Sequence, residues 1–303
     1  MDPAVSLRGL SKTFGEHQAV RDLSIDVPAG SIFGLLGRNG AGKTTTIRMI
    51  MDIIRPDTGE VRVLGRPLSD GSKDRIGYLP EERGLYPKMK VIEMLEFQGS
   101  VKGFSPSEAR AKATGWLDRL ELGAWSGRKV EELSKGMQQK VQFIASVISS
   151  PELLILDEPF SGMDPVNQDT FRDLILELHR AGCTIVFSTH VMESAEKLCR
   201  EIALIDKGRV VLGGTLSSIK QQFGKNSIQL EFDGDGSFLS GLPGVVKIHD
   251  YGQHVEIRLS QGADPQKILE ACVGRLTIHH FWVVSPTLHN IFVQKVGRDS
   301  ADA

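Results

Sequence analysis

The chain has 303 residues and a formal net charge of −2, with 24% charged and 40% hydrophobic residues. This composition is that of a folded protein of about two domains, and the near-neutral charge gives no support to general binding to nucleic acid or to an anionic membrane surface. The three cysteines lie far apart without a C-x-x-C pair, which excludes a disulfide framework and a zinc knuckle and fits a reducing cytosol. The stretch Met1–Leu10 has no basic segment followed by an apolar one, so no signal peptide is expected.

The first part of the chain alternates strand-like and helix-like patterns, which predicts an α/β architecture. Strands are expected at Val5–Leu10, Leu23–Val27 and Ser31–Leu36. A helix is expected at Thr44–Ile54, where the Pro56 that follows ends it.

A glycine-rich loop lies between the third strand and this helix. It fits the pattern G-x-x-x-x-G-K-[ST] and consists of Gly37, Arg38, Asn39, Gly40, Ala41, Gly42, Lys43 and Thr44. Its backbone N–H groups and the helix N-terminus can bind a phosphate. Lys43 is expected to reach the β- and γ-phosphates, the Thr44 hydroxyl to hold Mg²⁺, and Thr45 to complete the nucleotide site. The alternative, a glycine-rich turn with a chance lysine, is disfavoured by the flanking strand and helix.

A helical insert is expected at about residues 86–150. Its helices are Val91–Lys102, Ser107–Leu120 and Gly136–Ser149, the second of them preceded by the capping sequence Ser105-Pro106. The third helix follows the segment Leu133-Ser134-Lys135-Gly136-Met137-Gln138-Gln139. Ser134 is a good N-cap and the helix N-terminus can bind an anion, although a plain capped helix explains this segment equally well by itself.

Strands resume at Leu153–Leu156, Thr184–Ser188 and Ile202–Ile205, alternating with helices at Asn167–Ala181 and Met192–Cys199. This alternation predicts a mostly parallel sheet with crossover helices.

Two of these strands end in polar side chains of the types that bind metal ions or take part in catalysis. Asp157 and Glu158 end an apolar strand, where Asp157 can hold Mg²⁺ through its water shell and Glu158 can polarise an attacking water. The segment Pro159–Asp164 that follows directly argues against an ordinary strand with a solvated acidic end. His190 ends the next strand, and a lone histidine there is usually structural.

A small α+β accessory domain is expected at residues 217–303. Strands are predicted at Ser227–Phe232, Val245–His249 and His254–Leu259, and helices at Pro265–Cys272 and Thr287–Val296.

The segment Leu276–Gln294 has no charged residue and is just long enough to span a bilayer. It contains three histidines, a proline and an asparagine, so we reject a membrane span. The spacing of His279, His280 and His289 matches no standard metal site, and a structural role is favoured over a metal cluster.

The ordered motifs together resemble the nucleotide-binding subunit of ATP-binding cassette (ABC) proteins, over roughly Val5 to Gly213. The resemblance implies a P-loop NTPase domain at residues 1–216, ATP and Mg²⁺ as cofactors, and a dimer that sandwiches two ATP molecules. It also implies a role for each matching residue: Phe14 stacks on adenine, Val20 packs against the base, Asp157 carries the metal, Glu158 is the catalytic base, Ser161 to Asp164 form the D-loop, and His190 contacts the γ-phosphate. Ser134 and Gly136 of one subunit close the site around Lys43 of the other.

The chain departs from the family pattern at two positions. Lys135 stands where the signature usually has glycine, and either adds a charge-assisted contact or is simply solvated. Glu81 stands where the loop after Tyr-x-Pro usually has a metal-sensing glutamine. A carboxylate there can ligate Mg²⁺, or it can point to solvent and pair with Arg83 or Arg75.

The form of the signature, the stretch after Glu81 and the C-terminal domain resemble ATPase subunits of bacterial drug-resistance and sodium-extrusion exporters. In that group the permease is a separate integral-membrane protein, so the resemblance implies a homodimer on the cytoplasmic face of the membrane, with the permease docking around Glu81–Val91 and the insert. The alternatives are a soluble cassette protein of translation or DNA repair and a small-molecule kinase. The translation type carries two cassettes and the repair type a long heptad insertion, and this sequence has one cassette and no such insertion. The near-neutral charge also argues against nucleic acid. The Leu133–Gln139 signature disfavours a kinase, which has no use for it.

Overall fold

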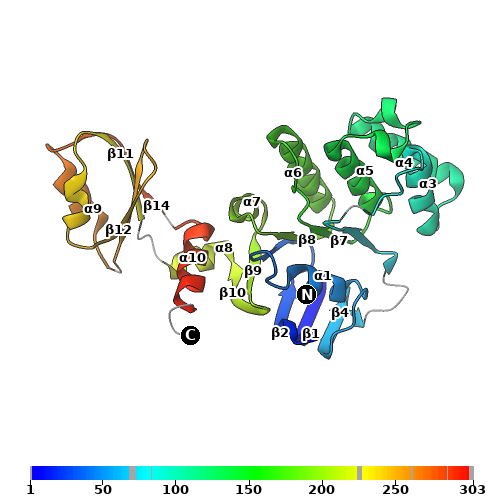
Figure 1. Ribbon diagram of the computed structural model, residues 1–303, viewed down its shortest axis with the longest axis horizontal. Helices are drawn as coiled ribbons and strands as arrows, with labels where there is room; N and C mark the ends of the chain where they lie inside the picture. Colours follow the sequence, from blue (N-terminus) through cyan, green and yellow to red (C-terminus); the bar gives the residue numbers. More distant parts are fainter. Residues whose placement is uncertain are drawn as a thin grey trace. The chain divides into compact units, whose positions relative to one another are not determined.

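The computed structural model describes residues 2–67, 73–82, 84–223, 227–260, 262–284 and 286–299 (Figure 1). The chain forms two compact units, Met1–Gly213 and Gly214–Ala303. Each unit has its own sheets and its own apolar core.

The first unit begins with an antiparallel sheet in the order β2-β1-β4-β5. Its strands are β1 (Val5–Phe14), β2 (His17–Val27), β4 (Thr58–Val63) and β5 (Arg66–Pro67). Alternate residues of β2 are buried, so this sheet covers the core with one face and leaves the other exposed.

A second sheet of the first unit has the order β10-β9-β3-β8-β7-β6. Its strands are β3 (Ile32–Leu36), β6 (Ile76–Leu79), β7 (Leu153–Asp157), β8 (Thr184–Thr189), β9 (Glu201–Asp206) and β10 (Arg209–Thr215). The neighbours from β9 to β6 pair in parallel, which confirms the predicted mostly parallel sheet. Every residue of β3 and β7 is buried, because helices or the other sheet cover both faces.

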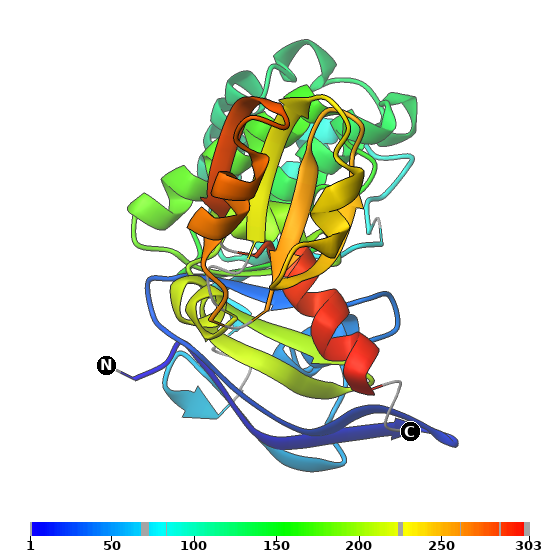
Figure 2. The ribbon, with the colours of Figure 1, turned by 90° about the vertical axis from the view of Figure 1, so that its left-hand side faces the viewer.

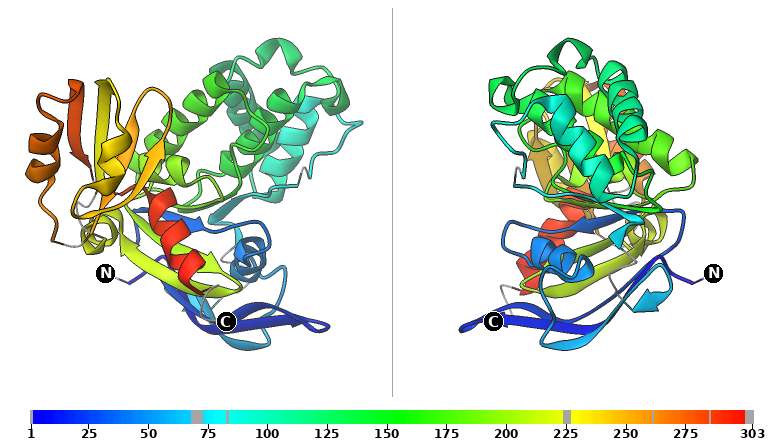
Figure 3. Two further views of the ribbon diagram at one scale, coloured as in Figure 1. Left: turned by 60° about the vertical axis from the view of Figure 1, so that its left-hand side comes forward. Right: turned by 90° about the vertical axis from the view of Figure 1, so that its right-hand side faces the viewer.

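Helices lie on both sides of the parallel sheet in the first unit (Figure 1). Helix α1 (Lys43–Ile50) shares one core with the two sheets. The insert contains α3 (Val91–Val101), α4 (Pro106–Arg119) and α5 (Lys135–Val147), with the short 3-10 helices η1 (Gly123–Trp125) and η2 (Val130–Glu132) between the last two, and faces the viewer in the right panel of Figure 3. Helices α6 (Pro165–Arg180) and α7 (Met192–Leu198) connect the later strands.

The second unit contains an antiparallel sheet in the order β12-β13-β11-β14 (Figure 2). Its strands are β11 (Ser227–Asp233), β12 (Val245–Asp250), β13 (Val255–Leu259) and β14 (Thr277–Val284). Its helices are α8 (Leu216–Gln222), α9 (Pro265–Cys272) and α10 (Leu288–Asp299), together with η3 (Ser237–Gly241). Residues of α9 and η3 share a core with alternate residues of β11 and β13.

Several elements differ from the sequence prediction. Helix α1 ends at Ile50 instead of Ile54, because Asp52 adopts a left-handed backbone with φ of +54°. Strands β4, β6 and β10 and helix α8 were not predicted. Strand β4 is mostly exposed and has only two apolar side chains, Val61 and Val63, which is too short a pattern to predict a strand.

The charge-free stretch Leu276–Gln294 contains strand β14 and the start of α10. The strand was not predicted, because a register shift opposite Glu231 and Phe232 breaks the alternation of apolar residues. In the described part of the chain, no helix has both the length and the apolar character that a membrane crossing requires.

Candidate functional site

The phosphate loop connects the end of β3 to the start of α1, as its motif predicts. Gly42 has φ of +108°, and a Cβ placed on it would lie 2.6 Å from the carbonyl oxygen of Ala19. The backbone therefore requires glycine at this position. Arg38, Asn39 and Gly40 are exposed at the tip of the loop, whereas Ala41 is buried.

Lys43 lies folded over the loop that precedes it, and is only 6% exposed. Its Nζ donates to the carbonyl oxygens of Gly37, at 2.9 Å, and Arg38, at 3.3 Å. The ammonium group is thus held beside the backbone N–H groups of the loop, where a phosphate would bind. Thr44 and Thr45 are half-buried in the first turn of α1.

Asp157 ends strand β7 and is completely buried. Burial raises the pKa of this carboxyl group, while hydrogen bonds from Ser188 and Thr44 lower the pKa in part. Ser188 Oγ donates to Asp157 Oδ1 across the parallel pair β7–β8. The other oxygen, Oδ2, is buried and has no hydrogen-bond partner among the described residues.

These residues fit the Mg²⁺ ion that the sequence predicts. An unpartnered buried carboxylate oxygen beside a threonine hydroxyl offers the hard oxygen ligands that Mg²⁺ prefers. In the described residues, no group of three His, Cys, Asp or Glu side chains could hold a metal ion. Mg²⁺ commonly takes only one or two carboxylates and completes its shell with water and phosphate oxygens, so the fit does not need such a group.

Glu158 follows β7 with a left-handed backbone, φ +48°, and its side chain is nearly buried. Its Oε1 lies 2.8 Å from His190 Nδ1 and 3.4 Å from Lys43 Nζ. Its Oε2 accepts a hydrogen bond from Thr189 Oγ1 at 3.2 Å. The structure therefore brings together three residues that the sequence placed in one site, at the carboxyl ends of β7 and β8 and the start of α1.

Glu81 lies just after β6, whose neighbour in the sheet is β7, and its side chain is exposed. Arg75, one of the two expected partners of Glu81, forms a two-point ion pair with Glu152. The other, Arg83, lies outside the described residues. Within the described ranges no ion pair involves Glu81, so the pairing with Arg75 is not observed.

The segment before α5 has the capped geometry that the sequence predicts. Ser134 is the N-cap, and its Oγ accepts from Met137 N at 3.3 Å. Gly136 lies near α6, since a Cβ on it would be 3.8 Å from Asn167 Nδ2. Asp164 caps α6 by accepting from Asn167 N at 3.0 Å, and its bonds with Asn167 lower the pKa of the carboxyl group.

The signature residues and the phosphate loop share no polar contact in the described part of one chain. No hydrogen bond or ion pair in the described part of the chain joins Ser134 or Gly136 to Lys43. Lys135 is exposed, and the first turn of α5 contains no acidic residue that would offset its charge.

The two residues expected at adenine differ in exposure. Phe14, at the end of β1, is 47% exposed, with Lys12 Nζ 5.6 Å from its ring centroid. Lys12 also pairs with Asp57 at 2.7 Å. Val20 is completely buried in the core beneath Gly42, so in this structure its side chain offers no surface for the expected contact with a base.

Sequence reasoning missed the roles of Ser188 and Thr189. Both lie at the end of β8, where they contact the two carboxylates at the end of β7. The sequence did carry a signal for these roles, because one predicted strand ends in two carboxylate residues and the next ends in two hydroxyl residues.

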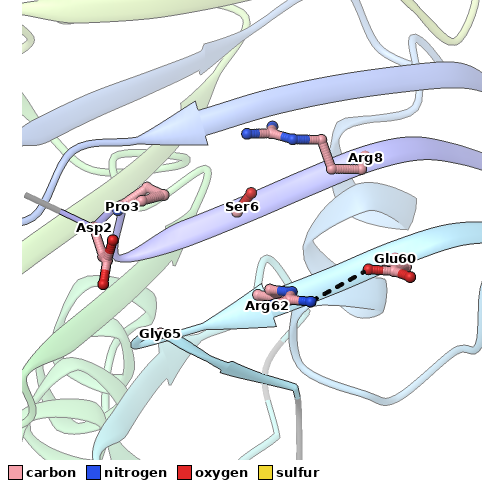
Figure 4. Close-up of a pocket in the computed structure, with 7 residues that line it drawn as sticks. All are labelled: Asp2, Pro3, Ser6, Arg8, Glu60, Arg62 and Gly65. Carbon is pink, nitrogen blue, oxygen red and sulfur yellow. Dashed lines mark ion pairs between the residues drawn. The ribbon is translucent and has the colours of Figure 1, made fainter.

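A depression of about 430 Å³ lies over β1 and β4 (Figure 4) and contains none of the expected site residues. Arg62 and Glu60 face each other there at 3.8 Å. None of its lining residues belongs to a nucleotide motif, so this surface does not compete with the constellation of Lys43, Glu158 and His190 as the candidate site.

Comparisons with known proteins give a consistent family. A family model described as ABC transporter matches residues 20–161, and a model of the C-terminal domain of DrrA1-3-like ATP-binding proteins matches residues 214–296. The chain is 43% identical to YhaQ, an uncharacterized ABC transporter ATP-binding protein of Bacillus subtilis, over 95% of this chain and 97% of YhaQ. It is 31% identical to the Nod factor export ATP-binding protein I of Rhizobium meliloti, over 99% of this chain and 90% of that protein. A solved ATP-binding subunit of an ABC transporter matches with a TM-score of 0.68 at 31% identity, covering 73% of this chain and 93% of that one.

Proposed function

The chain belongs to the ATP-hydrolysing, ATP-binding subunits of ABC transporters, and from this premise we propose that two copies close around two Mg²⁺–ATP complexes to drive export through a separate membrane permease. The observation that carries the proposal is the contact of Glu158 with Lys43 and His190 beside the phosphate loop. These groups come from three different elements, and they meet where a γ-phosphate would lie.

Each side chain of this constellation has a distinct role in the proposed reaction. Lys43 binds the β- and γ-phosphates, and Glu158 orients and polarises the attacking water. His190 holds the Glu158 carboxylate, since its Nδ1 lies 2.8 Å from Oε1, and we propose that it also contacts the γ-phosphate. Thr44 and Asp157 would hold Mg²⁺, which would neutralise negative charge on the phosphates. Phe14, whose side chain is exposed, is proposed to contact the adenine.

The sandwich of two subunits is supported by the surroundings of Gly136 in the described part of the chain. Among the described residues, a Cβ on Gly136 would meet Asn167 Nδ2 alone, at an ordinary 3.8 Å. The fold of one chain therefore does not require glycine there, whereas a phosphate approaching the N-terminus of α5 from a second subunit would. Asp164, close to this helix start through Asn167, is proposed to belong to the same interface.

The permease is proposed to dock on the insert near the loop after β6. Tyr86, Phe97 and Val101 are large apolar residues with exposed side chains, and the rings of Tyr86 and Phe97 pack edge to face at 6.0 Å. Exposed apolar side chains gathered on one surface are typical of protein contacts. The export direction is supported by the export protein of Rhizobium meliloti, and we propose the cytoplasmic membrane face as the location.

The second unit is proposed to be an accessory domain that acts on dimer contacts or regulation, with a boundary near residue 216. Its helix cap at Thr215 and its separate core support an independent fold. His279 pairs with Asp233 and His280 pairs with Glu231, which supports a structural role for these histidines.

The proposed function is tested by ATP hydrolysis and by cell fractionation. Lys43→Ala should lose hydrolysis by at least about a hundredfold, because electrostatic contacts to a transferring phosphoryl group are typically worth several kcal/mol. The wild-type chain, expressed with its permease, should be recovered with the membrane fraction. Near-normal turnover of Lys43→Ala contradicts the assignment of the site, and a chain that stays soluble with every candidate permease favours the non-transport alternative.

A further inference from the structure

The buried face of α5 carries two glutamines one turn apart. Gln139 is 5% exposed and Gln142 is 4% exposed. Buried amide side chains normally have hydrogen-bond partners, because they lose their bonds to water. The partners of these two amides are loops that follow neighbouring strands of the parallel sheet.

Gln142 holds the loop that carries Glu81. Its Nε2 donates to the carbonyl oxygens of Pro80, at 3.2 Å, and of Glu82, at 3.1 Å. One side-chain amide thus forms hydrogen bonds to the backbone on both sides of Glu81. Gln139 makes a parallel contact, since its Nε2 donates at 3.3 Å to the carbonyl oxygen of Pro159, the residue after Glu158.

Stability alone does not explain Gln142. Its Oε1 is buried without a partner among the described residues. An unpartnered buried oxygen destabilises a fold, and a hydrocarbon of the same shape would avoid that cost at the oxygen. The amide instead provides a fixed link between α5 and the loop at Glu81.

We propose that Gln142 is a positioning residue that couples the signature end of α5 to Glu81. The proposal rests on the function proposed above, in which Ser134 at the N-terminus of α5 engages the ATP of the second subunit. Helix α5 is a rigid element of 13 residues, so a shift of its N-terminus moves Gln142 and, through two hydrogen bonds, the backbone of Glu81. Occupation of one ATP site therefore adjusts Glu81 in the other.

The test measures ATP hydrolysis by the full chain against Mg²⁺ and against ATP, using Gln142→Met, which keeps the length of the side chain but not its donors. We expect the Mg²⁺ midpoint to move by about threefold or more and the Hill coefficient for ATP to fall toward one. Ser146→Ala is the matched control. Ser146 is buried on the same helix, and in the described part of the chain its hydroxyl donates to Phe143 within that helix, so its loss should lower the melting temperature without moving either kinetic quantity.

A double-mutant cycle with Glu81→Ala decides whether Gln142 acts through Glu81. If it does, Gln142→Met should shift the Mg²⁺ midpoint in the wild-type background but not in the Glu81→Ala background. An equal shift in both backgrounds, or a lowered melting temperature with unchanged midpoint and Hill coefficient, overturns the inference. Gln142→Leu serves as a second variant if Gln142→Met does not fold. A wild-type chain without ATP hydrolysis would instead overturn the proposed function.

Discussion

Replacing Glu158 by glutamine removes one negative charge from the proposed ATP site and changes little else. The side chains have the same shape, and neither is branched at Cβ, so the left-handed backbone at this position is no reason to prefer one over the other. Glutamine Oε1 can still accept a hydrogen bond from His190. The variant therefore separates the charge of Glu158 from the geometry of the site.

The magnitude of the change follows from two distances. The loss of a positioned general base typically slows a reaction by about 10²- to 10⁴-fold, and Glu158 is the carboxylate 2.8 Å from His190. The contact of 3.4 Å with Lys43 corresponds to about 5 kcal/mol of Coulomb attraction at an effective dielectric constant of about 20. Most of this attraction is offset by desolvation of the two charges. In the variant, Lys43 no longer has a charged partner to leave when it binds phosphate. We therefore expect ATP to bind more tightly to the variant by about 1 kcal/mol, which is roughly a fivefold lower Kd.

The assay combines steady-state ATP hydrolysis, equilibrium binding of ATP and size-exclusion chromatography. With ATP and Mg²⁺, Glu158→Gln should elute as a dimer, and with ADP it should not. Glu152→Gln is the matched control, because Glu152 lies at the opposite end of β7 in an exposed pair with Arg75 and should turn over normally. Hydrolysis by Glu158→Gln within about threefold of wild type would refute the assignment of the base, since even a modest general base contributes more. A monomer with every nucleotide would argue against the sandwich.

Three further predictions test other parts of the molecule. Truncation after Leu216 should leave ATP binding intact in an equilibrium binding assay, because every nucleotide motif precedes this residue. A truncated protein that folds but cannot bind ATP would show that the two units are interdependent. Glu81→Gln should retain hydrolysis and need less Mg²⁺ for its half-maximal rate, because the extra charge of Glu81 makes closure of the dimer more dependent on metal. An unchanged midpoint of the Mg²⁺ titration would indicate a solvated side chain. A loss of hydrolysis as deep as that of Glu158→Gln would mean that the catalytic carboxylate is wrongly assigned. Burial raises the pKa of Cys183 to about 11 and of Cys199 to about 12, so at pH 8 the folded chain should react with iodoacetamide far more slowly than the unfolded chain and should speed up only as the pH approaches these values. Equal labelling rates of the folded and unfolded chains at pH 8 would contradict their burial.

Local patterns in the sequence were sufficient for the parts of the site that one segment builds. The glycines before Lys43 predict a phosphate loop because the strand, the turn and the helix that form it are consecutive. Ser134 predicts a capped helix for the same reason, since a cap and the N–H group that it accepts from lie within one turn. The acidic end of β7 was also visible, because a fully buried strand leaves a continuous apolar run before Asp157.

The tertiary structure decided which of these segments meet. The strand order β10-β9-β3-β8-β7-β6 does not follow the chain, and no local pattern specifies it. This order places Ser188 and Thr189 beside the carboxylates of β7, and it places His190 within hydrogen-bond distance of Glu158. The link from Gln142 to the loop at Glu81 spans about sixty residues of chain. Such contacts depend on how sheets and helices pack in three dimensions. The free energy that stabilises these contacts comes from apolar surface that distant segments bury together, and the conformational preference of a single segment does not determine it.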